Sequence, residues 1–234
     1  MVDLLEFGGP PFLALLPDEL AARLIEAGVS VFFDDGESIH LRGDIRPGLS
    51  IVKSGAVRFS VPGIDGSNIT TSILGVGHCF GEATLFAHLP RTHDAEAVGR
   101  TNIIQITEKR IDRLFDEEPK LARYMLEATT HRLYSLVEFT DDLRRLPIDV
   151  RIAKILYSMV VQAKLENTID ANQSDIAFTL GVSRVSAGKS LNRLQSFGLI
   201  ELGYGKIRVI DKEALFDWID DNSVTAPLIR SMEN

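Results

Sequence analysis

The sequence predicts an α+β protein: an antiparallel β-domain, then one long helix, then a mainly helical domain. Three observations predict this order. Short stretches rich in Val, Ile, Phe and Thr alternate with glycines in the first hundred residues, which is typical of antiparallel strands. After Pro119 neither Gly nor Pro interrupts the chain until Pro147, which favours a long helix. The 234 residues are enough for two domains.

The first segments predict a short helix followed by a sheet. Residues 17–28 read as an amphipathic helix that begins near Pro17 and ends at Gly28. The expected strands are SVFF, SIHL, LSIV, AVRFSV, NITTSIL and NIIQI. Because they are short and recur at a spacing of roughly ten residues, they predict a sandwich or barrel. The IDG sequence at 64–66 predicts a hairpin turn, since Gly adopts positive φ.

A long helix is expected next. Thr107 is a plausible N-cap for the segment TEKRIDRLF, and Pro119 starts a helix that extends to about Leu146. Apolar residues and threonines recur along it in steps of three and four, which indicates a seam for a second helix. The predicted dimerisation residues are Leu126, Leu133, Leu136 and Leu143. The alternative is one amphipathic helix packed on its own domain. Pro147 marks a boundary, so the expected parts are 1–111, 112–146 and 147–234.

The segment after Asn172 predicts two short helices joined by a tight turn. Asn172 and Asp175 form a variant capping box, Gly181 tolerates the positive φ of the turn, and Ser183 caps the second helix. The side chains expected to point outward from that helix are Arg184, Ser186, Lys189, Ser190 and Arg193. The alternative is a generic pair of helices from a bundle.

GLIEL, GYG and KIRVID then read as two strands and a Gly-rich turn, a wing. A winged helix-turn-helix reads the DNA major groove with its second helix and contacts phosphates with its wing. The expected DNA-binding residues are Ser183, Arg184, Val185, Ser186, Lys189, Arg193, Lys206 and Arg208.

Charge and composition limit the function classes. The net charge of -8 by itself argues against a nucleic-acid partner, but residues 182–210 hold five basic side chains and one acidic side chain. The single cysteine, Cys79, excludes an internal disulfide and a Cys-rich metal or cluster site. No apolar run is long enough to span a bilayer, and the N-terminus lacks the basic residues of a signal peptide. We therefore expect a cytoplasmic protein without a metal or a membrane partner.

Together these segments resemble the Crp-Fnr family of bacterial transcription regulators. The matching text includes DDGESIHLRGD, LSIVKSGAVRFSV, LGVGHCFGEATLF and LPRT in the first domain. It continues with VRIAKIL, QSDIAFTLGVSRVSAGKSLNRLQSFGLIEL and KIRVID in the second. The resemblance implies a jelly-roll-like β-roll (a double-stranded β-helix), a long dimerisation helix and a C-terminal winged helix-turn-helix.

The resemblance also implies a ligand site in the run FGEATLFAHLPRT. In nucleotide-binding relatives the glutamate accepts from the ribose hydroxyl, and the arginine and the following hydroxyl residue hold the cyclic phosphate. Carried over, the ligand-binding residues are Gly81, Glu82, Ala83, Arg91 and Thr92. The expected ligand is a cyclic nucleotide, cyclic AMP or cyclic GMP. The alternative is a roll that binds no nucleotide, in which Glu82 and Arg91 pair with each other.

Two parts of the chain differ from the family pattern. Cyclic-AMP-responsive relatives carry a Thr-Ser pair on the long helix where this chain has Leu136 and Val137. Those side chains cannot hydrogen-bond a base, so a ligand other than cyclic AMP remains an alternative. In the recognition helix many relatives have glutamate where this chain has Val185, which can pack on a thymine methyl group but cannot accept from cytosine.

The leading interpretation is a homodimeric, ligand-responsive regulator that binds an inverted repeat in double-stranded DNA and works with RNA polymerase. No catalytic residue is predicted. Haem sensing through His78, His88 or His93 is one alternative. A cupin-like metal enzyme is another, but the chain has no His-x-His pair. A nucleotide-binding regulatory subunit without a DNA function is the third, and the winged helix argues against it.

Overall fold

The computed structural model describes residues 11–62, 68–163, 167–169 and 171–223. The expected turn at 64–66 lies outside these residues. The chain forms two compact units, one of residues 5–136 and one that contains residues 137–234. The division falls inside the long helix α4 (Pro119–Arg145).

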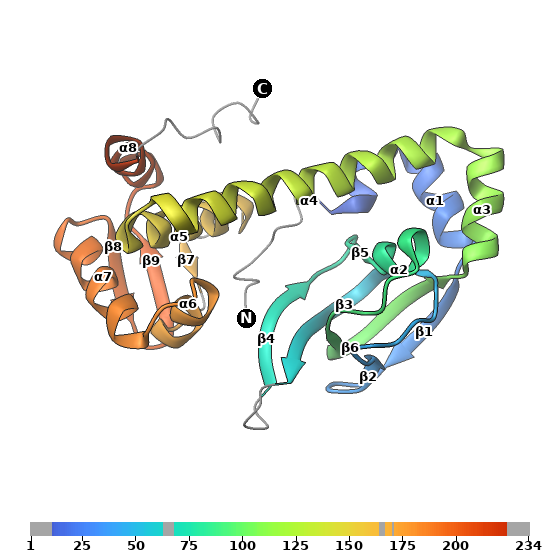
Figure 1. Cartoon of the computed structure of the whole chain (residues 1–234), viewed down its shortest axis with the longest axis horizontal. Coiled ribbons are helices and arrows are strands. Elements are labelled where there is room, and N and C mark those ends of the chain that lie inside the picture. Colours follow the sequence, from blue (N-terminus) through green and yellow to red (C-terminus); the bar gives the residue numbers. More distant parts are fainter. Residues whose placement is uncertain (1–10, 63–67, 164–166, 170, 224–234) are drawn as a thin grey trace. The chain divides into compact units, whose positions relative to one another are not determined.

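The N-terminal unit is built on one curved antiparallel sheet (Figure 1). Its strands are β1 (Val29–Phe33), β2 (Ser38–His40), β3 (Leu49–Pro62), β4 (Asn68–Leu74), β5 (Cys79–Phe80) and β6 (Asp94–Ile106). The order is β1-β6-β3-β4, with β2 also paired to β6 and β5 to β3. The expected β-roll is therefore present.

Two strands are longer than the sequence predicted. LSIV and AVRFSV form one strand, β3, which stays continuous through an irregularity at Gly55. Gly55 has φ +76°, and a Cβ there would lie 2.4 Å from Thr101 Oγ1. The strand NIIQI is only the second half of β6, whose first half pairs with β3 from Ala56↔Val98 to Ser60↔Asp94. Pairing across the sheet orders residues whose local pattern is weak.

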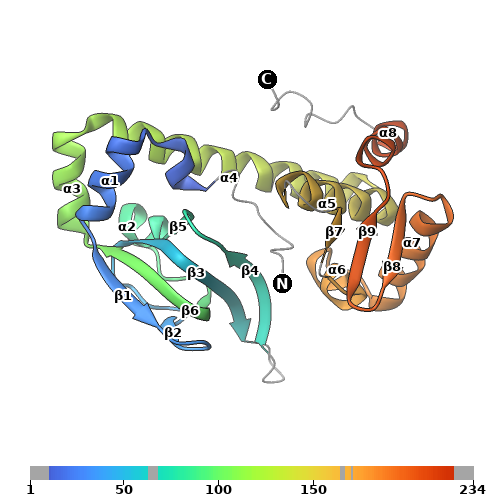
Figure 2. The same cartoon turned by 180° about the vertical axis from the view of Figure 1, so that it is seen from behind.

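Helices close one end of this unit. The short η1 (Phe12–Leu15) and α1 (Asp18–Glu26) precede the sheet, and α3 (Glu108–Glu117) follows it. Figures 1 and 2 both show α1 and α3 side by side at the start of α4. Arg23 of α1 pairs with Glu117 at 2.6 Å and also with Glu118. Leu24, Ile51 and Leu121 are among the fully buried side chains of this core.

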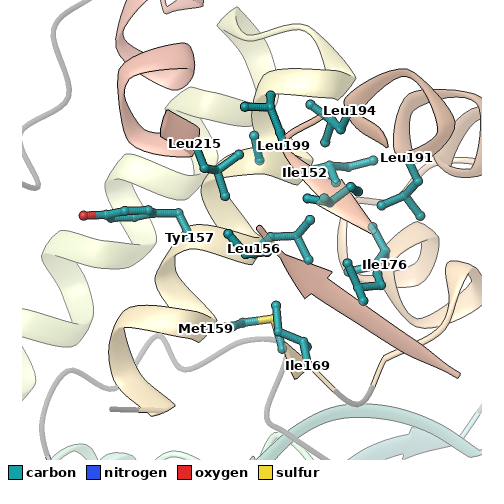
Figure 3. Close-up of a cluster of buried hydrophobic side chains, with 14 of the residues drawn as sticks. Ile152, Leu156, Tyr157, Met159, Ile169, Ile176, Leu191, Leu194, Leu199 and Leu215 are labelled. Atoms are coloured by element: carbon teal, nitrogen blue, oxygen red, sulfur yellow. The ribbon is translucent and has the colours of Figure 1, made fainter. Parts of the chain in front are cut away.

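The C-terminal unit has a separate core. Its elements after α4 are α5 (Ile148–Ala163), β7 (Thr168–Ile169), α6 (Gln173–Thr179), α7 (Arg184–Ser196), β8 (Ile200–Gly203), β9 (Lys206–Val209) and α8 (Lys212–Asn222). Figure 3 shows Leu156 of α5, Ile176 of α6 and Leu191 of α7 meeting in one cluster. The predicted wing is the β8–β9 hairpin.

The sequence did not predict β7 or α8. The strand β7 is two residues long and is ordered by pairing with β9, through Thr168↔Arg208 and Ile169↔Ile207. Helix α8 begins at a strong local signal, because the side chain of Asp211 accepts from the backbone N–H groups of Glu213 and Ala214.

Candidate functional site

The N-terminal unit contains a cavity of about 640 Å³. Its walls come from the sheet, from α2 (Glu82–Ala87), from the loop after α2, and from α4. All five predicted ligand residues line it: Gly81, Glu82, Ala83, Arg91 and Thr92. A cavity of this volume is in the usual range for small-molecule sites.

Gly81 allows the arginine of the motif to approach the backbone. Its φ is +106°, a region that residues with a side chain rarely adopt. A Cβ at this position would lie 2.5 Å from Arg91 Nη1 and 2.4 Å from the carbonyl oxygen of Gly48. Glycine is therefore required here for two reasons, the backbone angle and the room that the guanidinium occupies.

The backbone of Arg91 is fixed by hydrogen bonds, and the charge of its side chain remains available to a ligand. The Arg91 N–H donates to the Asp44 carbonyl at 2.8 Å, and the Arg91 carbonyl accepts from the Gly43 N–H at 2.8 Å. Burial lowers the pKa of Arg91, while Glu82 and Asp44 act in the opposite direction. Within the described residues no carboxylate forms a salt bridge with Arg91. A partly buried guanidinium of this kind suits a phosphate.

Glu82 pairs with Arg132 and not with Arg91. Arg132 Nη1 donates to Glu82 Oε1 at 2.5 Å, and Arg132 Nη2 donates to the Cys79 carbonyl at 3.1 Å. Burial lowers the pKa of Arg132, but Glu82 and Cys79 outweigh that effect and the net shift is upward. Arg132 was not predicted as a site residue, because it lies fifty residues after Glu82 in the chain and belongs to no motif.

The thiol of Cys79 and the imidazole of His40 are uncharged at neutral pH. Burial raises the pKa of Cys79 well above its usual value. Burial, followed by the charge of Arg91, lowers the pKa of His40 to about 4. Of the histidines considered as haem ligands, His93 lines the cavity and lies 2.8 Å from Thr92 Oγ1 through its Nδ1. His78 and His88 are not part of its lining.

The helix side of the cavity combines Thr129 and Arg132 with two leucines. Leu133 and Leu136 of α4 face it, together with Phe59, Leu74 and Phe80 from the sheet. The same helix presents an exposed apolar row in one subunit: Leu126 is 67% exposed, Leu133 59% and Leu136 46%. Leu143, the last predicted seam residue, is partly buried against the core of the C-terminal unit.

The C-terminal unit confirms the predicted turn at Gly181 and the caps at Ser183 and Asn172, whereas the side chain of Asp175, the other half of the predicted capping box, lies outside the described residues. Gly181 has φ +61°. Ser183 Oγ accepts from the Ser186 N–H at 3.1 Å, so it caps α7. Asn172 Oδ1 accepts from the Ser174 N–H at 2.8 Å at the start of α6.

The prediction that Ser190 points outward from α7 is wrong. Ser190 is 6% exposed, because it lies on the buried face of α7 with Ala187, Leu191 and Leu194. Arg184, Val185 and Lys189 are exposed, and Ser186 is half-buried. Val185 is 67% exposed, so an apolar side chain stands in the middle of a basic surface.

Two predicted phosphate contacts already have partners within the chain. Arg193 Nη1 lies 2.9 Å from Asp149 Oδ2 of α5, and Arg208 Nη1 lies 3.2 Å from Glu201 Oε2 across the wing. Lys206 opens β9 next to the wing turn. Tyr204 at that turn is fully exposed, and it was not among the predicted DNA-binding residues.

Comparison with known families gives one match for each unit. The model of the cyclic nucleotide-binding domain matches residues 30–118, and the model of the Crp-like helix-turn-helix domain matches residues 150–218. The chain is a member of the Crp-Fnr family of transcription regulators. As a member of this family, it is a regulator and not an enzyme.

Curated Crp-Fnr relatives match along most of the chain. The cyclic AMP receptor protein of Thermus thermophilus is 27% identical over 206 residues, which cover 86% of this chain and 93% of the relative. The CRP-like cAMP-activated global transcriptional regulator of Mycobacterium tuberculosis is 25% identical over 210 residues, which cover 87% and 93%.

A solved structure shares the fold. The c-di-GMP responsive global regulator CLP of Xanthomonas campestris superposes with a TM-score of 0.69 at 19% identity, over 83% of this chain and 100% of that one. In the part of this Crp-Fnr chain that the structure describes, no helix is both long and apolar enough to cross a membrane. The same residues include no cluster of three or more His, Cys, Asp or Glu side chains suited to a metal ion.

Proposed function

We propose that this protein is a homodimeric transcription regulator that binds an inverted-repeat operator and senses a cyclic nucleotide through its β-roll. One observation supports the link between the two activities. Leu133 and Leu136 line the cavity and also belong to the exposed apolar row of α4. A ligand in the cavity therefore contacts the same helix face that a second subunit would cover, and it can change how the two helices pack.

The polar end of the cavity fits a sugar-phosphate. Arg91 and the Thr92 hydroxyl supply donors for a phosphate, and Gly81 leaves the room that Arg91 needs. Glu82 Oε1 is held by Arg132, which leaves the second carboxylate oxygen to accept from a ribose hydroxyl. The carboxylate and the phosphate must stand apart, because like charges repel, and the motif separates Glu82 from Arg91 accordingly.

The helix end of the cavity offers little for reading a base. Leu133 and Leu136 have no polar atoms, and the Thr129 hydroxyl donates to the Met125 carbonyl at 2.7 Å. Arg132 is engaged by Glu82 and Cys79. We therefore propose that one subunit distinguishes adenine from guanine poorly, with affinities for cyclic AMP and cyclic GMP within about ten-fold.

DNA recognition is assigned to α7 and the wing. The N-terminal end of α7 presents Arg184, Val185 and Lys189 to the major groove, with Ser183 and Ser186 beside the backbone. Lys206 and Arg208 contact phosphates from the wing, and Arg193 contributes only after it leaves Asp149. RNA polymerase is the proposed partner of the DNA-bound dimer.

Calorimetry with cyclic AMP and cyclic GMP tests the ligand assignment. The Arg91→Ala variant should lose on the order of 2–4 kcal/mol of binding free energy, because a charge-assisted contact to phosphate is removed. Arg100→Ala is the matched control, since Arg100 is exposed on β6 and lies outside the cavity. Equal binding by wild type and Arg91→Ala would contradict the assignment. Binding of neither nucleotide to wild type would leave a regulator with another effector.

A further inference from the structure

A second cavity of about 630 Å³ lies next to the ligand cavity in the N-terminal unit. It is enclosed by the loop between β2 and β3, by the end of β6 and by Thr107 at the start of α3. His40 and Arg91 line both cavities. The proposed function makes no use of this second space.

The lining of the second cavity favours an anion. Arg46 and Arg91 contribute two positive charges and Asp44 one negative charge. Asp44 Oδ2 accepts from the Leu41 N–H at 3.0 Å, so this carboxylate is already engaged in its own loop. His40 is neutral at pH 7, because burial holds its pKa at about 4. The balance is one net positive charge around a partly enclosed space.

A serine side chain and the start of a helix also border this space. Ser50 is 6% exposed and lines the cavity, and among the described residues its hydroxyl makes no side-chain hydrogen bond. Helix α3 begins beside it, and Thr107 does not cap that helix with its side chain. The first amides of a helix have no acceptor within the helix and carry partial positive charge. The Ser50 hydroxyl on the cavity lining and the uncapped amides that follow Thr107 are hydrogen-bond donors for an anion.

We propose that the cavity between Arg46, Ser50, Arg91 and Thr107 binds the phosphate group of a small metabolite. Arg91 connects this site to the first cavity. Arg91 lines both cavities, and its guanidinium lies beside Gly81 of the first while its Nη2 lies 3.5 Å from the carbonyl oxygen of Gly48, which lines the second. One guanidinium cannot give its best geometry to two phosphates at once. The second anion therefore weakens nucleotide binding, a coupling that rests on the proposed function.

Titration of the full-length protein with inorganic phosphate, followed by amide NMR, tests the site directly. At ionic strength matched with sodium chloride, the amides of Arg46, Glu108 and Lys109 should shift and saturate. Arg46→Ala should weaken phosphate binding about ten-fold or more, because a charge-assisted contact is lost. Arg42→Ala is the control: it removes the same charge from the same loop, but Arg42 does not line the cavity.

Further measurements separate the possible results. Glycerol phosphate binding more tightly than inorganic phosphate would identify a phosphorylated metabolite as the ligand, whereas equal binding would identify phosphate itself. Shifts that do not saturate, or equal losses in the Arg42 and Arg46 variants, would overturn the site. This titration contains no nucleotide, so failure of the cyclic nucleotide assignment would not affect it. Arg46 is exposed, and unchanged thermal unfolding of Arg46→Ala would confirm that the variant folds.

Discussion

At the scale of single residues, the ligand cavity depends on one backbone angle and on one long-range ion pair. The left-handed φ of Gly81 brings its backbone against Arg91, and Arg132 fixes Glu82 from the other side. Arg91 and Glu82, the proposed phosphate-binding and sugar-binding residues, are thus held partly by neighbours outside the motif, namely Gly43, Asp44 and Arg132. Substitutions that leave the motif unchanged can therefore disturb the site.

Replacement of Gly81 by Ala should destabilise the N-terminal unit and impair ligand binding. The left-handed backbone costs a residue with a Cβ about 1–2 kcal/mol, and the new methyl group would displace the Arg91 guanidinium. Gly36→Ala is the control, because Gly36 also has positive φ but has open space around its Cβ position. Urea unfolding and calorimetry should show a stability loss in both variants and a binding loss only at Gly81.

His40 should make the N-terminal unit less stable in mild acid. Its pKa is about 4 in the folded protein and about 6.5 when unfolded. Between these values the unfolded chain binds more protons, so this contribution is fully present above pH 6.5 and is lost as the pH falls toward 4. Between about pH 7 and about pH 5 the loss is about 2 kcal/mol.

The His40→Gln variant should lose less stability over the same pH range, as measured by urea unfolding. The pKa of His78 and the pKa of His93 are also lowered by burial, so part of the pH dependence remains in this variant. The prediction fails if the wild type and His40→Gln show the same change between the two pH values.

At the scale of elements, helix α4 has one face that is buried and another that is exposed. One face packs Leu121 and Met125 into the core of the N-terminal unit, and another exposes the leucine row. Leu133 and Leu136 belong to both the row and the ligand cavity, whereas Leu126 belongs only to the row. Leu126 is therefore the position at which the proposed dimerisation can be tested separately from the proposed ligand binding.

The Leu126→Asp variant should shift the protein toward monomers. Burial of one leucine is worth about 1.5–3 kcal/mol in each subunit, and a charge in its place would have to be buried unpaired. Light scattering should show the change, and the double variant Leu133→Asp with Leu136→Asp should show it more strongly. Glu127→Lys, exposed on α4 but outside the row, should remain dimeric. A dimeric Leu126→Asp together with a dimeric double variant would rule out the row as the interface.

At the scale of the whole molecule, a basic surface is carried by an acidic protein. The net charge is -8, while α7 and the wing concentrate arginine and lysine on one unit with its own core. We therefore expect non-specific attraction to DNA to be weak, so that the proposed operator binding depends on the correct sequence and on two subunits. A two-fold dimer demands half-sites about 34 Å apart.

Two substitutions should separate base reading from phosphate contact. Arg184→Ala, at the start of α7, should weaken binding to the true operator by about 1–3 kcal/mol and relax the preference at one base pair. Lys206→Ala should weaken binding to all sequences alike and reduce the salt slope by about one unit. Selection from random DNA and salt titrations measure both effects. Identical sequence profiles for the two variants, or the absence of any inverted repeat, would contradict the assignment.

The sequence by itself determined the order of the parts, the caps and the turn residues. Ser183 caps α7 and Gly181 adopts positive φ because both properties depend on neighbours within a few residues. The family resemblance also indicated that Gly81, Glu82, Arg91 and Thr92 belong together, and all four line one cavity. The two longest strands were only partly predicted, since β3 and β6 order each other across the sheet.

Only the tertiary structure decided which side chains meet. Arg132 pairs with Glu82, Arg193 pairs with Asp149, and Ser190 is buried. The burial of Ser190 does have a local signal, since Ser190 shares the i, i+3, i+4, i+7 spacing of Ala187, Leu191 and Leu194. The two ion pairs have no local signal, because each joins residues far apart in the sequence. The second cavity has the same origin: Arg46, Ser50, Arg91 and Thr107 are scattered along the chain, and the closure of the sheet brings them together.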